Sequence, residues 1–222
     1  KQMKISQSGL RDFYNPEYCK IKWEESYING YRSRPTAAML DGLVFEQNVI
    51  GMSRGGEFYE IPKGKTGNTL KRETDVQPEW ETDDLIGHPD ALITYKGEKA
   101  IMDLKYTAMR EDESCRWNPY AWSDLEHKDF SQAIHYIELY YRMTKEYLPF
   151  FYLVFGKSGW VKFISIDLTN DSLTEYRTTL KNFKKDIKTF KPEGINKYEI
   201  CRKCPITCNE RITKPQIITI EC

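Results

Sequence analysis

The sequence predicts a mixed α/β domain in which a central sheet is flanked by helices. Helical and strand-like segments alternate over 222 residues in the order helix, strands, helix, strands, helix. With 40% hydrophobic residues, the composition is that of an ordinary globular chain. A chain of this size can bury one sizeable core. We therefore expect a single domain over residues 1–222.

Five segments have helical patterns, namely residues 9–14, 17–28, 35–51, 128–146 and 171–190. Ser6 or Ser8 can cap the first of them. Pro35 fits the first helical position of the third, which Gly51 closes. Residues 52–82 are polar, Gly-rich and charged, so we expect an insertion or a lid there.

Strand patterns occur at residues 85–106, 149–156, 160–168 and 216–220. The first of these reads as a hairpin around a two-residue turn, Lys96-Gly97. That turn places Tyr95 opposite Glu98 and, further along, Asp90 opposite Asp103. The register is decisive, because a slip of one residue would send the two aspartates to opposite faces.

Two aspartates that face each other across a ladder repel each other, so the pair needs an explanation. Asp103 and Lys105 are two residues apart on one strand and share a face, and Asp90 can join them from the neighbouring strand. Glu46 lies on the apolar stripe of helix 35–51, between Leu43 and Val49–Ile50, and is expected to point inward. Burying unpaired carboxylates is costly, so the three acidic residues favour a divalent cation between them. Mg²⁺ or Mn²⁺ suits such oxygen ligands.

Each of these residues also has a plainer interpretation. Asp90 can cap a turn, Asp103 and Lys105 can form a solvated pair, and Glu46 can reach solvent from the helix edge. The convergence of three separate segments is what favours the metal site.

The same residues resemble the PD-(D/E)XK nucleases, in particular their RecB-like branch with its CRISPR-associated exonucleases. The signature is "PD" at Pro89-Asp90 followed by "DLK" at residues 103–105. The family's upstream acidic position is matched by Glu46 in "GLVFE". The Gln and Tyr that this branch carries four residues apart are matched by Gln132 and Tyr136 in "QAIHY".

The resemblance implies a restriction-endonuclease-like core over residues 35–168, between an N-terminal helical segment (1–34) and a C-terminal helix with a cysteine segment (169–222). It implies a Mg²⁺- or Mn²⁺-dependent deoxyribonuclease, more specifically an exonuclease of phage or bacterial DNA recombination, repair or metabolism, leaving a 5′-phosphate. Recombination or CRISPR-type proteins are its implied partners, and the oligomeric state is open.

In that reading the metal ligands are Glu46, Asp90, Asp103 and the Leu104 carbonyl. Lys105 would assist the attacking water, and Gln132 and Tyr136 would face the metal site or the scissile phosphate.

The cysteines add a second resemblance. Some RecB-like nucleases, including the CRISPR-associated and AddB-type enzymes, hold an iron–sulfur cluster with one cysteine before the core and three after it. This chain has Cys19, then Cys201, Cys204 and Cys208 in "CRKCPITC", which implies a [4Fe–4S] cluster that clips the two ends of the chain together. The spacing of the last three is tighter than is usual in that family.

Alternatives to that cluster remain open. Cys222 is a rival fourth ligand, zinc accepts four thiolates equally well, and unligated thiols are the third possibility. We expect Cys115 to be a free thiol.

DNA contacts are expected from basic and aromatic side chains, although the overall charge gives no such signal, because 33 basic residues balance 33 acidic ones. The Lys-rich helix can contact phosphates through Lys181, Lys184 and Lys185, as can Lys20, Lys22, Arg32 and Arg34 near the N-terminus. Trp117 and Trp122 can stack on unpaired bases or anchor their own segment to the domain. A lysine run is also a common solvated helix face.

No apolar run reaches the roughly 20 residues that span a bilayer, and "KQMKISQSGL" lacks a signal-peptide core. These features predict a soluble, cytoplasmic protein. Two alternative functions remain: a weakly catalytic or non-catalytic DNA-binding or assembly module, and a zinc-stapled interaction protein.

Overall fold

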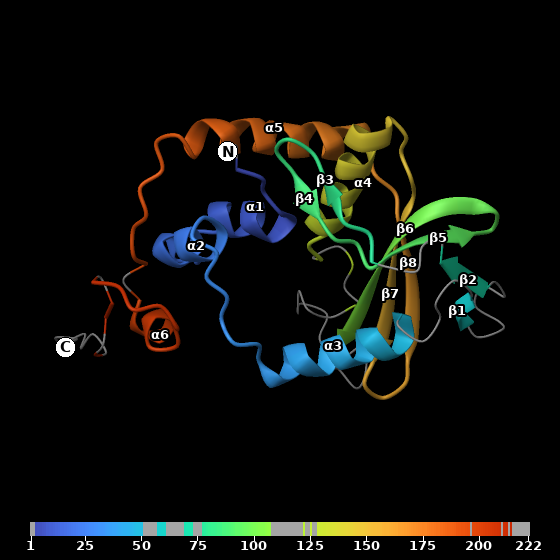
Figure 1. The fold of residues 1–222 in the computed structure, drawn as a ribbon, viewed down its shortest axis with the longest axis horizontal. Coiled ribbons are helices and arrows are strands. Elements are labelled where there is room, and N and C mark those ends of the chain that lie inside the picture. The colour runs from blue at the N-terminus through green and yellow to red at the C-terminus, as the bar shows by residue number, and fades with distance from the viewer. Residues whose placement is uncertain are drawn as a thin grey trace, which may run out of the picture.

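The computed structural model describes residues 3–50, 57–60, 69–72, 77–107, 122, 125, 128–195, 197–209, 211–212 and 214. Its helices are α1 (Gln7–Tyr14), α2 (Lys20–Tyr27), α3 (Ala37–Ile50), α4 (Ser131–Thr144), α5 (Asn170–Asp186) and α6 (Tyr198–Cys201). Its strands are β1 (Glu57–Glu60), β2 (Thr69–Arg72), β3 (Trp80–Glu81), β4 (Ile86–Gly87), β5 (Ala91–Tyr95), β6 (Glu98–Thr107), β7 (Phe150–Gly156) and β8 (Val161–Ile166). The predicted mixed α/β class is confirmed (Figure 1).

The main sheet has the strand order β1-β2-β5-β6-β7-β8, and β3 and β4 form a separate two-stranded ribbon. Strands β6 and β7 are parallel, and the other neighbouring pairs are antiparallel. The sequence of β7, "FFYLVFG", is apolar without alternation because both of its faces are buried. The sheet is therefore mixed, with its most buried strands at the β6–β7 junction.

The β5–β6 hairpin has the predicted turn and register. Lys96 and Gly97 have φ values of 52° and 83°, the left-handed geometry that a two-residue turn of the primed type requires. Tyr95 pairs with Glu98, and the ladder continues to the pair Ala91 and Met102. The next position in this register sets Asp90 opposite Asp103.

Helices cover the two faces of the sheet unequally. Ile101 packs in one core cluster with residues of α1, α2, α4 and α5, whereas Met102 and Leu104 belong to a second cluster on the other face. Phe45 of α3 packs against this second cluster. In Figure 1, α4 and α5 lie together at the upper side, and α3 crosses the lower part of the strands. The Ile101 face, which also carries Asp103 and Lys105, is thus the face next to α4.

Two expectations for the chain between residues 35 and 82 were wrong. The segment expected as an insertion or lid contains β1, β2 and β3, and the first two extend the edge of the main sheet. Their charged composition suits an edge strand, which is half solvated. Helix α3 begins after Pro35, because the Thr36 hydroxyl accepts a hydrogen bond from the Met39 amide at 3.3 Å and caps the helix.

Among the described residues, no helix is both long and apolar enough to cross a bilayer. The strand expected at residues 216–220 lies outside the described part of the chain.

Candidate active site

Asp103 is the buried centre of the candidate site. It lies on β6, only 2% of it is exposed, and its Oδ1 accepts a hydrogen bond from Gln132 Nε2 at 3.2 Å. Lys105 Nζ forms an ion pair with Oδ2. Burial raises the pKa of the Asp103 carboxyl, even though the Lys105 charge opposes the rise.

Asp90 meets Asp103 from the neighbouring strand. The Leu104 amide donates a hydrogen bond to Asp90 Oδ2 at 2.6 Å, so the carboxylate continues the hairpin ladder one step beyond Ala91 and Met102. Gln77 Nε2 lies 3.4 Å from Asp90 Oδ1. The two carboxylates are therefore brought together by the backbone at residues 103–104, as the register predicted.

Helix α4 supplies two further polar side chains to the same place. Gln132 and Tyr136 are one turn apart, and Gln132 Nε2 lies 3.4 Å from the Tyr136 hydroxyl. That hydroxyl donates to the His88 carbonyl at 3.2 Å. Burial and the charge of Asp103 raise the pKa of Tyr136 to about 12, so the phenol keeps its proton at neutral pH. Both residues thus lie beside the carboxylate pair, and that they face a metal ion or the scissile phosphate stays a prediction.

A second lysine, missed from the sequence, lies close to Lys105. Lys128 Nζ lies 3.9 Å from the centre of the Trp122 ring, and Trp122 packs on Tyr152 with 5.5 Å between ring centres. Lys105 Nζ is 5.7 Å from the Tyr152 ring. Burial and the positive charge of Lys105 lower the pKa of Lys128. No motif marks Lys128, because its place depends on the packing of the two aromatic rings.

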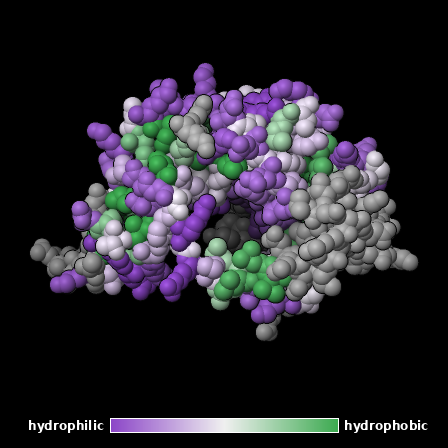
Figure 2. Space-filling view, viewed as in Figure 1, coloured by the Kyte–Doolittle hydropathy of each residue, from purple (hydrophilic) through white to green (hydrophobic). Residues whose placement is uncertain are grey.

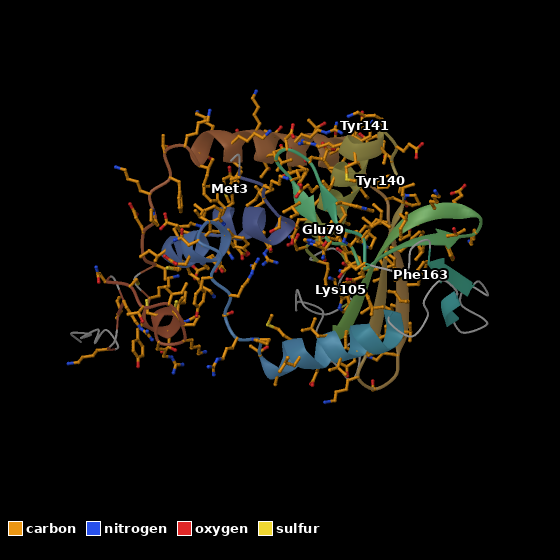
Figure 3. The ribbon with its side chains drawn as sticks, in the orientation of Figure 1. Met3, Glu79, Lys105, Tyr140, Tyr141 and Phe163 are labelled. Atoms are coloured by element: carbon orange, nitrogen blue, oxygen red, sulfur yellow. The ribbon has the colours of Figure 1, made fainter. Side chains whose placement is uncertain are left out.

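The site lies beside an open region of the surface. Figure 2 shows a hollow near the middle of one face of the molecule, and Figure 3, in the same orientation, labels Lys105 beside it. The side chain of Lys105 is 32% exposed, whereas that of Asp103 is 3% exposed. Lys105 is therefore the member of the pair that solvent or a ligand reaches first.

The expectation that Leu43 lies on the inward face of α3 was wrong. Leu43 and Val44 are 56% and 59% exposed, and Figure 2 shows an apolar area at its lower edge, where α3 lies in Figure 1. Phe45 is the residue that packs on the sheet, stacked on Tyr106 with 4.5 Å between ring centres. The side chain of Glu46 lies outside the described part of the chain, so its place at the site stays a prediction.

The residues expected to touch DNA differ in their surroundings. Lys181 and Lys185 are exposed on α5, whereas Lys184 forms an ion pair with Asp84 at 2.7 Å. Trp122 is buried. Of the two roles predicted for Trp122, its burial favours anchoring its own segment to the core over stacking on DNA bases. Trp117 lies outside the described part.

Lys20 also has an intramolecular role. Its ammonium donates to the carbonyls of Asp12, Phe13 and Asn15 at 3.3, 2.6 and 2.9 Å. Lys20 therefore supplies hydrogen bonds to carbonyl groups at the C-terminal end of α1. An ammonium engaged in this way is not available for the expected contact with a phosphate.

Four cysteines line one small cavity together with Ile195, Ile200 and Ile206, namely Cys19, Cys201, Cys204 and Cys208. Two contacts hold the ends of the chain together there: the Glu17–Lys197 ion pair at 2.6 Å and the bond from the Lys20 amide to the Glu193 carbonyl at 3.2 Å. Figure 1 shows α6 at the same end of the molecule as α2. Cys115 and Cys222 lie outside the described part.

The described residues fit metal ions only in part. Within them, no three Asp, Glu, His or Cys side chains are arranged to hold a metal ion. At the carboxylate pair the third expected ligand, Glu46, is not among the described side chains. The buried Oδ2 of Asp103, which is paired with the Lys105 ammonium, is nevertheless an anionic oxygen of the kind that a divalent cation binds. The four thiols are a donor set that suits iron–sulfur clusters or zinc.

The chain resembles known proteins in its fold rather than in its sequence. No family model and no curated protein matches the sequence. Among solved structures, a candidate exonuclease from Eubacterium rectale is 17% identical, with 97% of this chain and 91% of that chain covered and a TM-score of 0.59. An alkaline exonuclease from Laribacter hongkongensis is 12% identical, with coverage of 84% and 88% and a TM-score of 0.47. The match to the Eubacterium rectale protein shows that the two chains share their α/β fold.

Proposed function

We propose that this protein is a metal-dependent deoxyribonuclease, and more specifically an exonuclease of phage or bacterial DNA recombination or repair. The observation that carries the proposal is the meeting of Asp90, Asp103 and Lys105 on adjoining strands beneath α4. Two buried carboxylates and an ammonium at one point are costly unless they serve a ligand or a reaction. The shared fold with a candidate exonuclease supports the same assignment.

Each residue has a distinct proposed role. Asp90, Asp103, Glu46 and the Leu104 carbonyl would hold Mg²⁺ or Mn²⁺. When bound, such an ion polarises a phosphoryl oxygen and lowers the pKa of a coordinated water. Lys105, beside the exposed edge of the pair, would orient the attacking water or neutralise charge on the phosphate.

Two residues of α4 and two of α5 complete the proposed site. Gln132 and the protonated Tyr136 would hold the carboxylates and face the scissile phosphate. Lys181 and Lys185 would contact the DNA backbone elsewhere. We assign these roles to a single nuclease domain.

The test is a DNA-degradation assay with single-stranded, double-stranded and flapped substrates in Mg²⁺, in Mn²⁺ and in EDTA. We expect degradation that requires the divalent ion. Degradation from ends only, with circular DNA left intact, would establish the exonuclease mode. If every substrate stays intact while the protein still binds DNA, the non-catalytic module becomes the better description.

We further propose that the four cysteines hold a [4Fe–4S] cluster, with zinc as the alternative. The support is that thiols from both ends of the chain line one cavity with apolar walls. A cluster there would join the segment before α2 to the segment after α5, and Cys222 remains a rival ligand.

Replacing Cys204 tests this cluster. Protein purified without oxygen should be brown, with broad absorbance near ~400 nm, and Cys204→Ser should be pale with its iron content reduced. Cys115→Ser serves as the matched control that keeps the colour, whereas Cys222→Ser tests the rival ligand: loss of colour there would make Cys222 one of the four ligands. A colourless parent protein with one zinc per chain would replace the cluster by a zinc site, and a metal-free parent would exclude both.

A further inference from the structure

Residues Asp84–His88, which we call the β4 arm, lead directly into Pro89-Asp90. The arm is held by the N-terminal segment, because the Ile5 amide donates to the Asp84 carbonyl at 2.9 Å and the Ile86 amide donates to the Ile5 carbonyl at 3.2 Å. This pairing fixes one edge of the arm at residues 84–86. The opposite edge pairs with β3, where Trp80 lies opposite Gly87 and Glu81 opposite Ile86.

Two successive residues of α4 bind the arm further along the chain. His135 Nε2 lies 2.9 Å from the Ile86 carbonyl, and the Tyr136 hydroxyl donates to the His88 carbonyl at 3.2 Å. The two carbonyls are two residues apart and so point to the same side of an extended chain. The α4 helix therefore binds the arm at two points immediately before Asp90.

The His135 ring can make its contact in only one tautomer. A carbonyl oxygen only accepts, so Nε2 must carry the proton that it donates to Ile86. In a neutral ring Nδ1 is then an acceptor, and the Tyr176 hydroxyl of α5 lies 2.6 Å from it. His135 is fully buried, so no water competes for either nitrogen. The Ile86 carbonyl thus sets the tautomer, and the Tyr176 hydroxyl, which donates to Nδ1, orients the ring.

Close packing at Gly87 leaves the arm little freedom. A Cβ atom at Gly87 would lie 2.7 Å from Cε1 of Tyr136 and 3.0 Å from Cδ2 of Leu139. The backbone of the arm therefore touches α4 directly, which only a glycine permits. Because of this close contact, the position of α4 determines the position of the arm.

The same helix also holds the second carboxylate, because Gln132 donates to Asp103 Oδ1. One rigid element thus contacts both the strand that carries Asp103 and the arm that delivers Asp90. We propose that His135, oriented by Tyr176, is a positioning residue that fixes Asp90 relative to Asp103. This inference rests on the proposed function for its consequence in catalysis but not for its geometry.

The test compares His135→Phe, which keeps a ring but has no ring nitrogen, with Ile137→Ala. Ile137 is equally buried on the same helix and has no hydrogen bond to the arm, so it controls for general destabilisation. His135→Gln should behave more like the parent than His135→Phe does, because the glutamine amide can still donate a hydrogen bond to the Ile86 carbonyl. Tyr176→Phe removes the hydroxyl that orients the His135 ring, and it also covers the case in which His135→Phe does not fold.

The first measurement is the exchange rate of the Leu104 amide by NMR, in protein without added metal. That amide donates to Asp90 Oδ2, so its protection reports the position of the Asp90 carboxylate. We expect faster exchange in His135→Phe and Tyr176→Phe than in the parent and in Ile137→Ala. Equal exchange in His135→Phe and Ile137→Ala would overturn the proposal.

The second measurement is Mn²⁺ affinity by calorimetry, together with the kinetics of DNA degradation. We expect His135→Phe to bind Mn²⁺ about tenfold more weakly, as for other groups that orient metal ligands. The loss should appear in kcat, with KM for DNA close to that of the parent. A parent protein that binds no metal and cleaves no DNA would refute the proposed function, while the Leu104 exchange would still decide the role of His135.

Discussion

Replacing Asp103 by asparagine is expected to lower the rate of DNA degradation by about a thousandfold, which corresponds to ~4 kcal/mol of transition-state stabilisation. Asparagine keeps the shape of the side chain and can still contact Gln132, but it removes the anionic Oδ2 beside Lys105. The loss therefore isolates the charge from the packing. The measurement is a degradation assay in Mn²⁺ at saturating DNA.

The unfolding temperature of Asp103→Asn distinguishes a loss of catalysis from a loss of folding. Asp103 is 2% exposed, and a carboxylate at such a site is costly to keep charged. We therefore expect Asp103→Asn to unfold in metal-free buffer at a temperature no lower than that of the parent. Asp83→Asn is the matched control, because it removes the same charge from an exposed position between β3 and β4 and should leave both properties unchanged. An Asp103→Asn protein that degrades DNA as fast as the parent would remove Asp103 from the site.

The second large effect expected is a loss of stability below neutral pH that depends on His135. Burial lowers the pKa of His135 to about 4 in the folded protein, against about 6.5 in an unfolded chain. As pH falls below about 6.5, the unfolded state takes up the proton and the folded state does not, so the free energy of unfolding decreases. The decrease attributable to His135 reaches about 3 kcal/mol near pH 4, where the unfolded state is protonated and about half of the folded molecules are.

Other groups near His135 set the size of this effect. Arg142 on α4 lowers the pKa of the ring, and Asp84 on the β4 arm raises it. Tyr176 on α5 keeps its proton, because burial raises the pKa of its hydroxyl. Asp84 stays ionised over most of this range, since the ion partners Lys184 and Arg142 lower its pKa despite its burial. The ring is therefore the group that changes charge between pH 6.5 and 4.

Urea unfolding at several pH values measures the slope. His135→Gln cannot titrate, so its free energy of unfolding should fall less steeply than that of the parent between about pH 6.5 and 4. Other acidic groups contribute equally to both proteins and cancel in the comparison. Parallel pH profiles for the parent and His135→Gln would contradict the assignment.

Much of the carboxylate pair could be predicted because its determinants are local. The Lys96-Gly97 turn fixes the register of β5 on β6, and that register alone brings Asp90 to Asp103 and sets Lys105 on the same face. The spacing of Gln132 and Tyr136 likewise sets them one turn apart on α4. A two-residue turn and a helical period leave few alternatives, so these positions follow from the sequence.

The α3 helix shows where this reasoning fails. Its sequence, "AAMLDGLVFEQNVI", is apolar on nearly every side, so periodicity does not distinguish one face from another. Leu43 was expected inside and is exposed, whereas Phe45 packs on the sheet. The choice of face depends on Tyr106 and Phe155, the rings on which Phe45 packs, and these lie more than 60 residues away in sequence.

The sequence by itself determined the α/β class, the hairpin with its facing aspartates, and the grouping of Asp103 with Lys105, because each depends on neighbours within a few residues or one tight turn. Only the tertiary structure decided that Lys128 stands near Lys105, that Trp122 is buried, and that His135 bridges Ile86 and Tyr176. The last contact joins residues 49 and 41 positions apart. Such contacts depend on how whole elements pack, and an isolated histidine in a helical pattern contains no sign of the partners that packing will give it.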